Sequence, residues 1–289
     1  MAEPRISRRL IVCADDFGRD LAINEAVEIA HRGGILTTAS LMVGAPAAAD
    51  AVARARRLPG LRVGLHLVLI DGAPLSPAAE VAPLLGRNGR FDDNQLRAAL
   101  RWFLWPGMRR HLAAEIEAQF AAFAATGLVL DHVNAHQHMH VHPTVARLVV
   151  DIGRRYGLRA VRLPYEPARV LRRAFPAERH HIPNFSPAVA ALRRRLRHAG
   201  LASNDYVFGL AWSGGMTEER LLGLLPHLPP GTSEIYCHPA TRASRDLVAL
   251  MPGYRPVDEL GALLSTRVRA RLGELGISLV GYRDLAPSR

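Results

Sequence analysis

Acidic residues and histidines able to bind a catalytic metal ion occur at three places in this chain. Four histidines alternate with other residues between positions 136 and 142, two aspartates are adjacent at positions 15 and 16, and His66 lies in an apolar segment. Neutral imidazoles and carboxylates bind catalytic divalent ions, and three protein ligands leave a coordination position for water or substrate. The set predicts a metal-dependent hydrolase.

Not all of these residues can serve the same ion. Adjacent carboxylates can divide the work, one binding the ion and the other accepting a proton from water. Side chains two positions apart in a strand share a face, but four in a row cannot all reach one ion. We expect one or two ligands from the histidine run, and a structural role for His142, which precedes Pro143. Contacts of His138 and His140 with metal or substrate remain open.

Length and composition indicate one large domain, residues 1–289. The chain has 289 residues, of which 49% are hydrophobic. No stretch approaches the roughly 20 uninterrupted apolar residues that cross a bilayer, so we expect a cytoplasmic protein. Its two cysteines, Cys13 and Cys237, stand in apolar runs and cannot form a disulfide scaffold. We expect buried thiols without chemistry.

Strand-like apolar runs alternate with helix-like segments along most of the chain. Strands are expected at 9–14, 35–43, 62–69, 128–135, 160–163, 206–211, 234–237 and 277–280, and helices at 24–31, 47–58, 111–125, 144–156, 218–225 and 257–275. This alternation favours an α/β fold whose parallel sheet closes into a (β/α) barrel. No glycine-rich nucleotide-binding fingerprint is present at the expected strand–helix junctions.

A barrel would bring the polar residues together. The carboxyl ends of parallel barrel strands converge on one rim, where catalytic residues gather. Candidates at or near such ends are Asp15, Asp16, His66, His136, Arg162 and His238.

Two stretches interrupt the pattern, at about 71–106 and 165–204, and we expect them to be insertions over the rim. Trp102 and Trp105 lie in the first stretch, and Trp212 follows the second. These tryptophans could offer a stacking face to a sugar ring. Ordinary packing is the alternative for each of them.

The formal charge of +11 comes from arginine, since the chain has no lysine. Arginines concentrate between Arg169 and Arg197, with apolar residues between them, namely Val170, Leu171, Phe175, Leu192 and Leu196. The segment is either a solvated helix face or a surface for peripheral contact with a membrane or an acidic ligand, in which case its apolar residues could rest on a bilayer. A non-enzymatic nucleic-acid binder would explain the charge, but no such motif accompanies it and the histidines would stay unexplained. We expect no nucleic-acid partner.

Several motifs together resemble the YdjC-like carbohydrate deacetylase family, in order and over nearly the whole chain. They are Ala14-Asp15-Asp16-Phe17-Gly18, Gly64-Leu65-His66-Leu67, Asn134-Ala135-His136-Gln137-His138-Met139-His140, Arg162-Leu163-Pro164 and His238-Pro239. The stretches 45–69, 131–136 and 160–167 are most similar to the branch associated with hopanoid biosynthesis. Asn134 and Gln137 depart from relatives that deacetylate chitin-derived disaccharides, which carry aspartate and histidine there.

The resemblance implies a distorted (β/α) barrel of the polysaccharide-deacetylase type and removal of an N-acetyl group from an amino sugar. It also implies a metal site at Asp16, His66 and His136, with Asp15 as the neighbouring base. Family members are described as magnesium-dependent, whereas two imidazoles and one carboxylate suit zinc better. The ion is left open between the two.

The expected mechanism assigns two further residues. Arg162 would help the ion stabilise the oxyanion, and His238 would protonate the departing amine. The hopanoid-branch similarity favours an N-acetylglucosamine-bearing lipid precursor as substrate. Chitin-type oligosaccharides are the alternative, and a metal-dependent phosphoesterase or glycosidase on a similar barrel is a rival reaction.

Overall fold

A single sheet of parallel strands runs through the centre of the protein. The computed structural model describes residues 8–179 and 186–286, and all its strand pairings are parallel. The strand order is β4-β3-β2-β1-β6-β5, with β7 paired to the start of β1. The strands are β1 (Arg8–Phe17), β2 (Thr38–Leu41), β3 (Arg62–Leu67), β4 (Leu130–Ala135), β5 (Tyr206–Phe208), β6 (Gly231–Cys237) and β7 (Ile277–Leu279).

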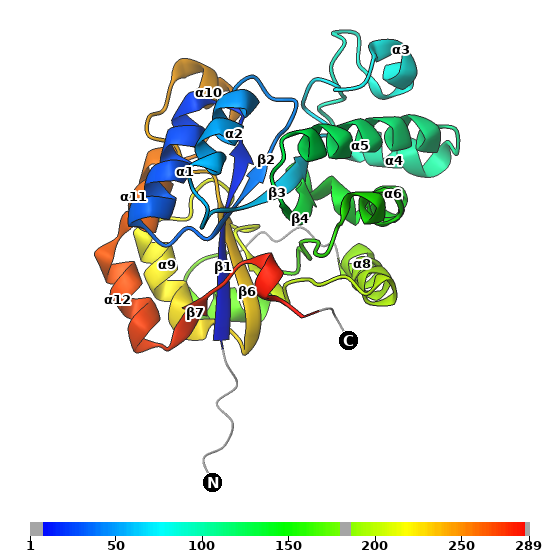
Figure 1. Ribbon diagram of the computed structural model, residues 1–289. Helices are drawn as coiled ribbons and strands as arrows, with labels where there is room; N and C mark the ends of the chain where they lie inside the picture. Colours follow the sequence, from blue (N-terminus) through cyan, green and yellow to red (C-terminus); the bar gives the residue numbers. More distant parts are fainter. Residues whose placement is uncertain (1–7, 180–185, 287–289) are drawn as a thin grey trace.

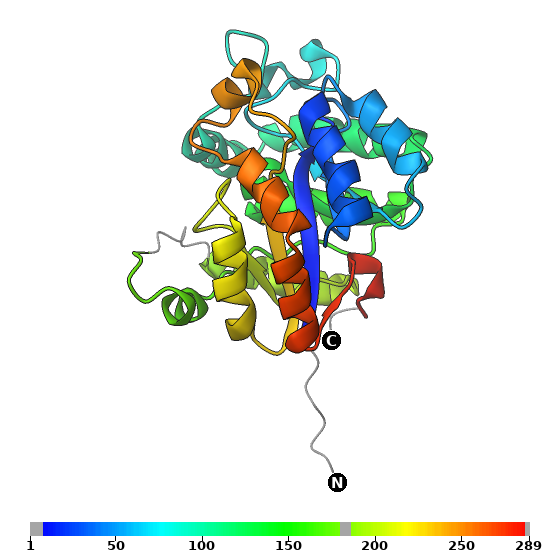
Figure 2. The same cartoon turned by 90° about the vertical axis from the view of Figure 1, so that its left-hand side faces the viewer.

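Helices flank the sheet on both sides of β1 (Figure 1). On the left of that view lie α1 (Leu21–Gly33), α2 (Ala48–Arg56), α9 (Glu218–Leu224), α11 (Pro256–Leu264) and α12 (Thr266–Glu274), and on the right α5 (Met108–Ala125), α6 (Pro143–Gly153) and α8 (Ser186–Ala199). In Figure 2, β1 is visible between α1 on its right and α9, α11 and α12 on its left. The predicted helix at 257–275 is two helices because Ser265 interrupts it and caps α12, its hydroxyl accepting the N–H of Val268.

Shorter elements complete the chain. They are the helices α3 (Ala78–Val81), α4 (Gln95–Leu104), α7 (Ala168–Ala174) and α10 (Arg245–Leu250), and the 3₁₀ turns η1 (Ala82–Leu84), η2 (His136–Val141), η3 (Arg154–Tyr156), η4 (Leu225–His227) and η5 (Tyr282–Asp284). Among the described residues, no helix is long and apolar enough to span a membrane.

The α/β class with a barrel-like parallel sheet is confirmed, but the strand predicted at 160–163 is absent as a regular strand. Only isolated bridges occur there, from Val161 to β4 and from Ala160 to Ala202, and they lie between β4 and β5. Pro164 has no N–H to extend a ladder. The Asn204 side chain bonds both the N–H and the carbonyl of Leu163, which replaces a neighbouring strand. The sheet is therefore a half-barrel.

The two interrupting stretches are partly helical. The first contains α3, η1 and α4, while the second contains α7, which packs against α9, and α8, which packs against α6. Residues 180–185 of the second stretch lie outside the described residues. The position of either stretch over the rim stays a prediction.

The apolar residues of the arginine-rich segment do not face outward, which corrects the expectation that they rest on a bilayer. Val170, Leu171, Leu192 and Leu196 are at most 5% exposed and belong to the main core. Phe175 is partly buried against the same core. The segment turns its arginines to solvent and its apolar side chains inward, as an amphipathic surface helix does. Cys13 and Cys237 are buried free thiols, as predicted.

Candidate metal centre

The end of β1 separates two adjacent carboxylates. The pairing of β1 with β2 is irregular between Ala14 and Phe17, and Asp16 has a left-handed φ of 61°. A bulge of this kind redirects side chains that would otherwise alternate across the strand. As a result, Asp15 and Asp16 are both buried but bind different partners.

Asp16, His66 and His136 come together as predicted and form a possible metal-binding triad. One ligand atom from each lies within 4.8 Å of the others. His66 Nε2 is 3.3 Å and His136 Nδ1 is 3.4 Å from Asp16 Oδ1. Within residues 8–179 and 186–286, this buried carboxylate oxygen has no hydrogen-bond partner. Two imidazole nitrogens and one oxygen facing a common point fit a divalent cation.

Neighbouring side chains orient both imidazoles. Asn134 Oδ1 lies 2.7 Å from His66 Nδ1, so that nitrogen carries the proton and Nε2 is free to bind an ion. On the other ring, His136 Nε2 lies 3.6 Å from Asp71 Oδ2. Arg19 donates to Asp16 at 2.8 Å and its other terminal nitrogen is 3.9 Å from Asp71.

The triad attracts positive charge. Burial by itself would lower the pKa of His136, but the carboxylates of Asp16 and Asp71 outweigh it and raise that pKa to about 9. The same balance, with burial opposed by His136, His66 and Arg19, holds the pKa of Asp16 well below its usual value. The site therefore presents a carboxylate that stays ionised.

Asp15 belongs to a second, saturated cluster with Arg162, Glu234 and Tyr282. Arg162 donates to the two Asp15 oxygens at 2.5 and 2.9 Å and to Glu234 at 2.6 to 3.0 Å. Tyr282 donates to Glu234 Oε2 at 2.5 Å. Asn134 Nδ2 also donates to Asp15, at 3.1 Å, which links this cluster to His66. Despite burial, which opposes ionisation, Arg162 keeps the pKa of Asp15 far below its usual value.

This geometry changes the expectation for Arg162. Its side chain has no exposed surface, and each of its three guanidinium nitrogens donates to Asp15 or Glu234. A substrate oxyanion does not reach such a group in this structure. Arg162 acts through Asp15, which it fixes and keeps charged.

Known proteins resemble this chain in both sequence and fold. The sequence profile described as YdjC-like protein matches residues 9–274. The chain belongs to the YdjC-like family. A carbohydrate deacetylase from Geobacillus stearothermophilus is 32% identical over 283 residues, covering 96% of this chain and 98% of that protein. A carbohydrate deacetylase from Mus musculus is also 32% identical, covering 100% and 98%.

The fold also matches a solved structure. An Enterococcus faecalis protein superposes with a TM-score of 0.74 at 23% identity, covering 97% of this chain and 99% of that one. At this identity the likeness establishes the fold alone.

In this YdjC-like chain, His238 follows β6 and its backbone is fixed. Its N–H donates to Glu259 at 2.6 Å, and its ring packs between Tyr236 and Tyr254. Burial lowers the pKa of His238, so the ring is neutral near pH 7. Its Nδ1 has no hydrogen-bond partner among the described residues.

The remaining histidines of the run contact neighbouring groups of the protein. His138 approaches the Tyr236 hydroxyl at 3.3 Å, and His140 contacts the carbonyl of Arg162 at 3.0 Å. Burial is the largest cause lowering the pKa of both, to about 3 for His140, so both are neutral. His142 caps α6 by accepting the N–H of Thr144, which is a structural role.

Two of the three tryptophans cannot stack on a sugar as expected. Trp102 is 4% and Trp212 is 6% exposed. Trp102 packs edge-on against His142, and Trp212 donates to Glu178. Trp105 is 57% exposed, but it follows the last residue of α4. The opposite end of this helix lies near the triad, where its first residue, Gln95, donates to the carbonyl of Gln137.

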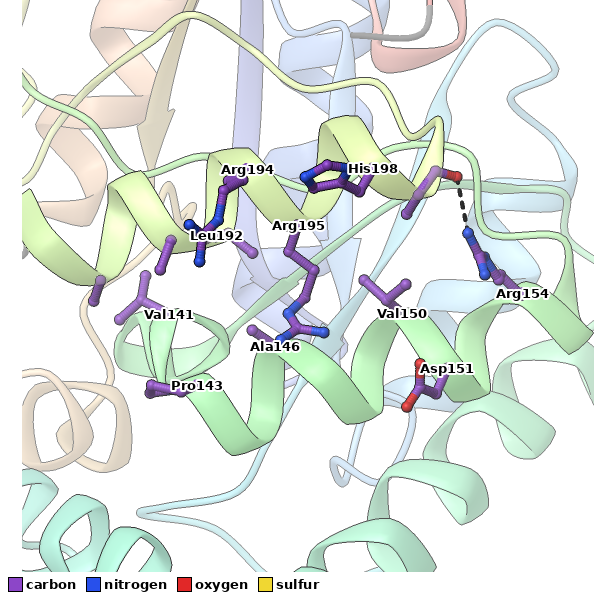
Figure 3. A pocket seen from close by; sticks show the side chains of 13 residues that line it. Val141, Pro143, Ala146, Val150, Asp151, Arg154, Leu192, Arg194, Arg195 and His198 are labelled. Atoms are coloured by element: carbon purple, nitrogen blue, oxygen red, sulfur yellow. Dashed lines mark hydrogen bonds between the residues drawn. The ribbon is translucent and has the colours of Figure 1, made fainter.

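A separate groove lies between α6 and α8 (Figure 3). Arg154, Arg194, Arg195 and His198 surround it, and Arg154 donates to the carbonyl of Ala199. No triad residue lines this groove. It displays the positive charge of the arginine-rich segment away from the candidate metal centre.

Sequence reasoning missed four residues that shape the site, namely Arg19, Asp71, Glu234 and Tyr282. Glu234 had a signal, because a carboxylate inside an apolar strand requires a buried cation. Asp71 lies four residues after β3, and its approach to His136 depends on the path of a loop. No local pattern encodes that path.

Proposed function

We propose that this protein is a metal-dependent carbohydrate deacetylase that hydrolyses the N-acetyl group of an N-acetylglucosamine-bearing substrate. The observation that carries the proposal is the buried triad, whose oxygen Asp16 Oδ1 lacks any partner among the described residues. Membership of the YdjC-like family and the names of the two relatives support the reaction.

Asp16, His66 and His136 would hold one divalent ion. The donor set, two imidazoles and a carboxylate, fits zinc by ligand preference, and magnesium is the ion implied by the family resemblance. When bound, such an ion supplies Lewis acidity toward a carbonyl oxygen and makes water a better nucleophile near neutral pH.

The chain's own residues then have distinct tasks. Asn134 holds the His66 ring in orientation, and the Asp71 carboxylate lies 3.6 Å from His136 Nε2, where we propose that it orients the second ring. Asp15, kept ionised by Arg162, is the proposed proton acceptor. His238 is neutral, and its buried Nδ1 has no hydrogen-bond partner among the described residues. It is the proposed hydrogen-bond partner of the departing amine.

The proposed substrate is a glycolipid of the hopanoid type, as the resemblance of residues 45–69, 131–136 and 160–167 implies. Exposed arginines such as Arg172, Arg194 and Arg197 would support contact with anionic headgroups at the cytoplasmic face of a membrane without inserting apolar side chains.

The test compares N-acetylglucosaminyl lipids with chitin oligosaccharides, scored by released acetate and by the mass of the product. We expect acetate from at least one class, and a loss of about a thousandfold in Asp16→Asn, since a metal ion contributes several kcal/mol to such a transition state. Asp151→Asn, on the surface of α6, is the matched control and should match the wild type. Release of phosphate or reducing sugar in place of acetate, or an Asp16→Asn variant with intact metal content and hydrolysis, would overturn the proposal.

A further inference from the structure

A cavity of about 310 Å³ opens directly beside the triad. Two of its lining residues, Arg19 and Asp71, are the same side chains that contact the triad. Arg19 donates to Asp16 at 2.8 Å, and Asp71 lies 3.6 Å from His136. A molecule whose reacting group lies at the triad therefore has this cavity within immediate reach.

The walls of the cavity are largely apolar. Its apolar lining residues are Met42, Ala45, Pro46, Val68, Ala73 and Leu75. Leu75 is 37% exposed, a high value for a leucine beside a binding site. The other side chains that line the cavity are polar. Glu115 and Gln119 are buried and engaged with the protein itself, Arg19 and Asp71 contact the triad, and Arg90 is exposed to solvent.

Glu115 and Gln119 fix the wall in place. Gln119 accepts the N–H of Val68 at 2.9 Å and donates to its carbonyl at 2.7 Å. Glu115 accepts the N–H groups of Leu75 and Ser76, each at 2.9 Å. Both ends of the loop that follows β3 are thus pinned to α5. A binding wall held in this way loses little entropy when a ligand binds.

We propose that this cavity binds an apolar substituent of the amino-sugar substrate, larger than the methyl of an acetyl group. This inference rests on the proposed deacetylase function. The volume is at the lower end of the range for small-molecule pockets, roughly 300 Å³ and above, and far exceeds one methyl group. Arg19, Asp71 and Arg90 could pair with some hydroxyl groups of a second sugar ring, but those placed against Met42, Val68 and Leu75 would have no partner, which is unfavourable.

The apolar substituent can be the glycosidic group or the N-acyl group of the sugar, and two substrate series distinguish these positions. One series compares the methyl and octyl glycosides of N-acetylglucosamine. The other compares N-acetyl with N-hexanoyl glucosamine as the methyl glycoside. We expect kcat/KM to rise about tenfold or more with chain length in one series, because even single methylenes in an apolar pocket change specificity by about that factor.

The Leu75→Asn variant tests whether the cavity is responsible. It should remove most of the chain-length advantage while changing kcat/KM for the N-acetyl methyl glycoside less than about threefold. Leu100→Asn is the matched control, since Leu100 is 50% exposed on α4 and does not line the cavity. It should keep the advantage.

Binding of octyl glucosaminide, which has no acyl group, gives a readout independent of catalysis on the glycoside side. If the octyl series shows the advantage, calorimetric titration should show that octyl glucosaminide binds more tightly than methyl glucosaminide. Leu75→Asn should abolish this difference in affinity. The inference is wrong if acetate is released but neither series prefers the longer chain, or if Leu75→Asn leaves the preference intact. If no compound in either series is hydrolysed by the wild type, the proposed function fails instead.

Discussion

Two buried polar clusters meet at the end of β1, and they differ in how completely their atoms are paired. In the cluster of Arg162, Asp15, Glu234 and Tyr282, every carboxylate oxygen accepts at least one hydrogen bond. In the triad, Asp16 Oδ1 and His136 Nε2 have none within the described part of the chain. Leaving a buried polar atom unpaired costs about 1 to 3 kcal/mol, and a cation bound at the triad would remove this cost for Asp16 Oδ1.

The comparison shows that burial and charge alone do not identify a ligand site. Asp15 and Asp16 are adjacent, 2% and 1% exposed, and both have a pKa held below the usual value. Only the pairing of their oxygens separates them. A saturated carboxylate is held ionised by its hydrogen-bond donors, whereas an unsaturated one among imidazoles is prepared for an ion.

Removing the cation of the saturated cluster should have the largest effect. Arg162→Met leaves two buried carboxylates facing each other without compensation, and the free energy of unfolding should fall by about 4 kcal/mol. Urea denaturation followed by circular dichroism measures this. The substitution should also raise the pKa of Asp15, because the nearest positive charge is lost.

A compensated variant separates charge from packing in that experiment. Arg162→Met combined with Asp15→Asn and Glu234→Gln removes the unpaired charges and should recover most of the lost stability, but not acetate release. If the single variant is as stable as the wild type, Arg162 is not the centre of a buried ion cluster.

Glu166 offers a third arrangement, a buried carboxyl that only backbone N–H groups satisfy. Burial raises its pKa to about 7, against the opposing effect of bonds from Gly209, Ala211 and Leu210. The folded protein therefore keeps a proton that the unfolded chain loses above about pH 4.5. Stability should fall as the pH rises from there to about 7, by on the order of 3 kcal/mol in total.

Glu166→Gln should abolish this part of the pH dependence, because glutamine does not titrate. The difference in unfolding free energy between wild type and variant, measured at about pH 5 and about pH 8, should change by about 2 kcal/mol in favour of the variant at the higher pH. Glu274→Gln, an exposed position on α12, should show no such change. A constant difference for Glu166→Gln would mean that its carboxyl titrates normally.

Hydrophobic periodicity was sufficient for the fold class and for candidates near the carboxyl ends of parallel strands, which must converge. The choice of Asp16, His66 and His136 among those candidates came from the resemblance to the YdjC-like family. It was insufficient where the backbone departs from regular structure. The strand predicted at 160–163 was wrong because Pro164 and the Asn204 side chain interrupt the ladder there. Similarly, the expectation of an outward-facing apolar surface near Val170 and Leu192 was wrong. Hydrophobic periodicity shows which face of a helix is apolar, but not whether that face packs on the core or on a membrane.

The pairing of individual atoms was also beyond the sequence. Arg162 was expected to face the substrate, and only coordinates place its guanidinium between Asp15 and Glu234. The three tryptophans were chosen by residue type, which does not determine exposure. Trp102 and Trp212 are buried and Trp105 is exposed. Side-chain contacts between distant segments decide such roles.

Asp71 provides the finest test of the comparison, because it acts on the triad from outside. Its carboxylate lies 3.6 Å from His136 Nε2, the nitrogen that does not face Asp16. Carboxylates behind metal-bound imidazoles orient the ring and raise its basicity, and their loss weakens metal affinity by about 10- to 100-fold. Calorimetric titration of metal-free Asp71→Asn with Zn²⁺ should show this weakening.

The control for Asp71 must separate its two neighbours, the triad and the cavity. Asp93→Asn, with a side chain 84% exposed, should bind Zn²⁺ like the wild type. If Asp71 only lined the cavity, its substitution would change KM for substrates with apolar substituents and leave the Kd for Zn²⁺ unchanged. If it orients His136, the Kd rises even without any substrate, because the ring loses the carboxylate that lies beside its second nitrogen.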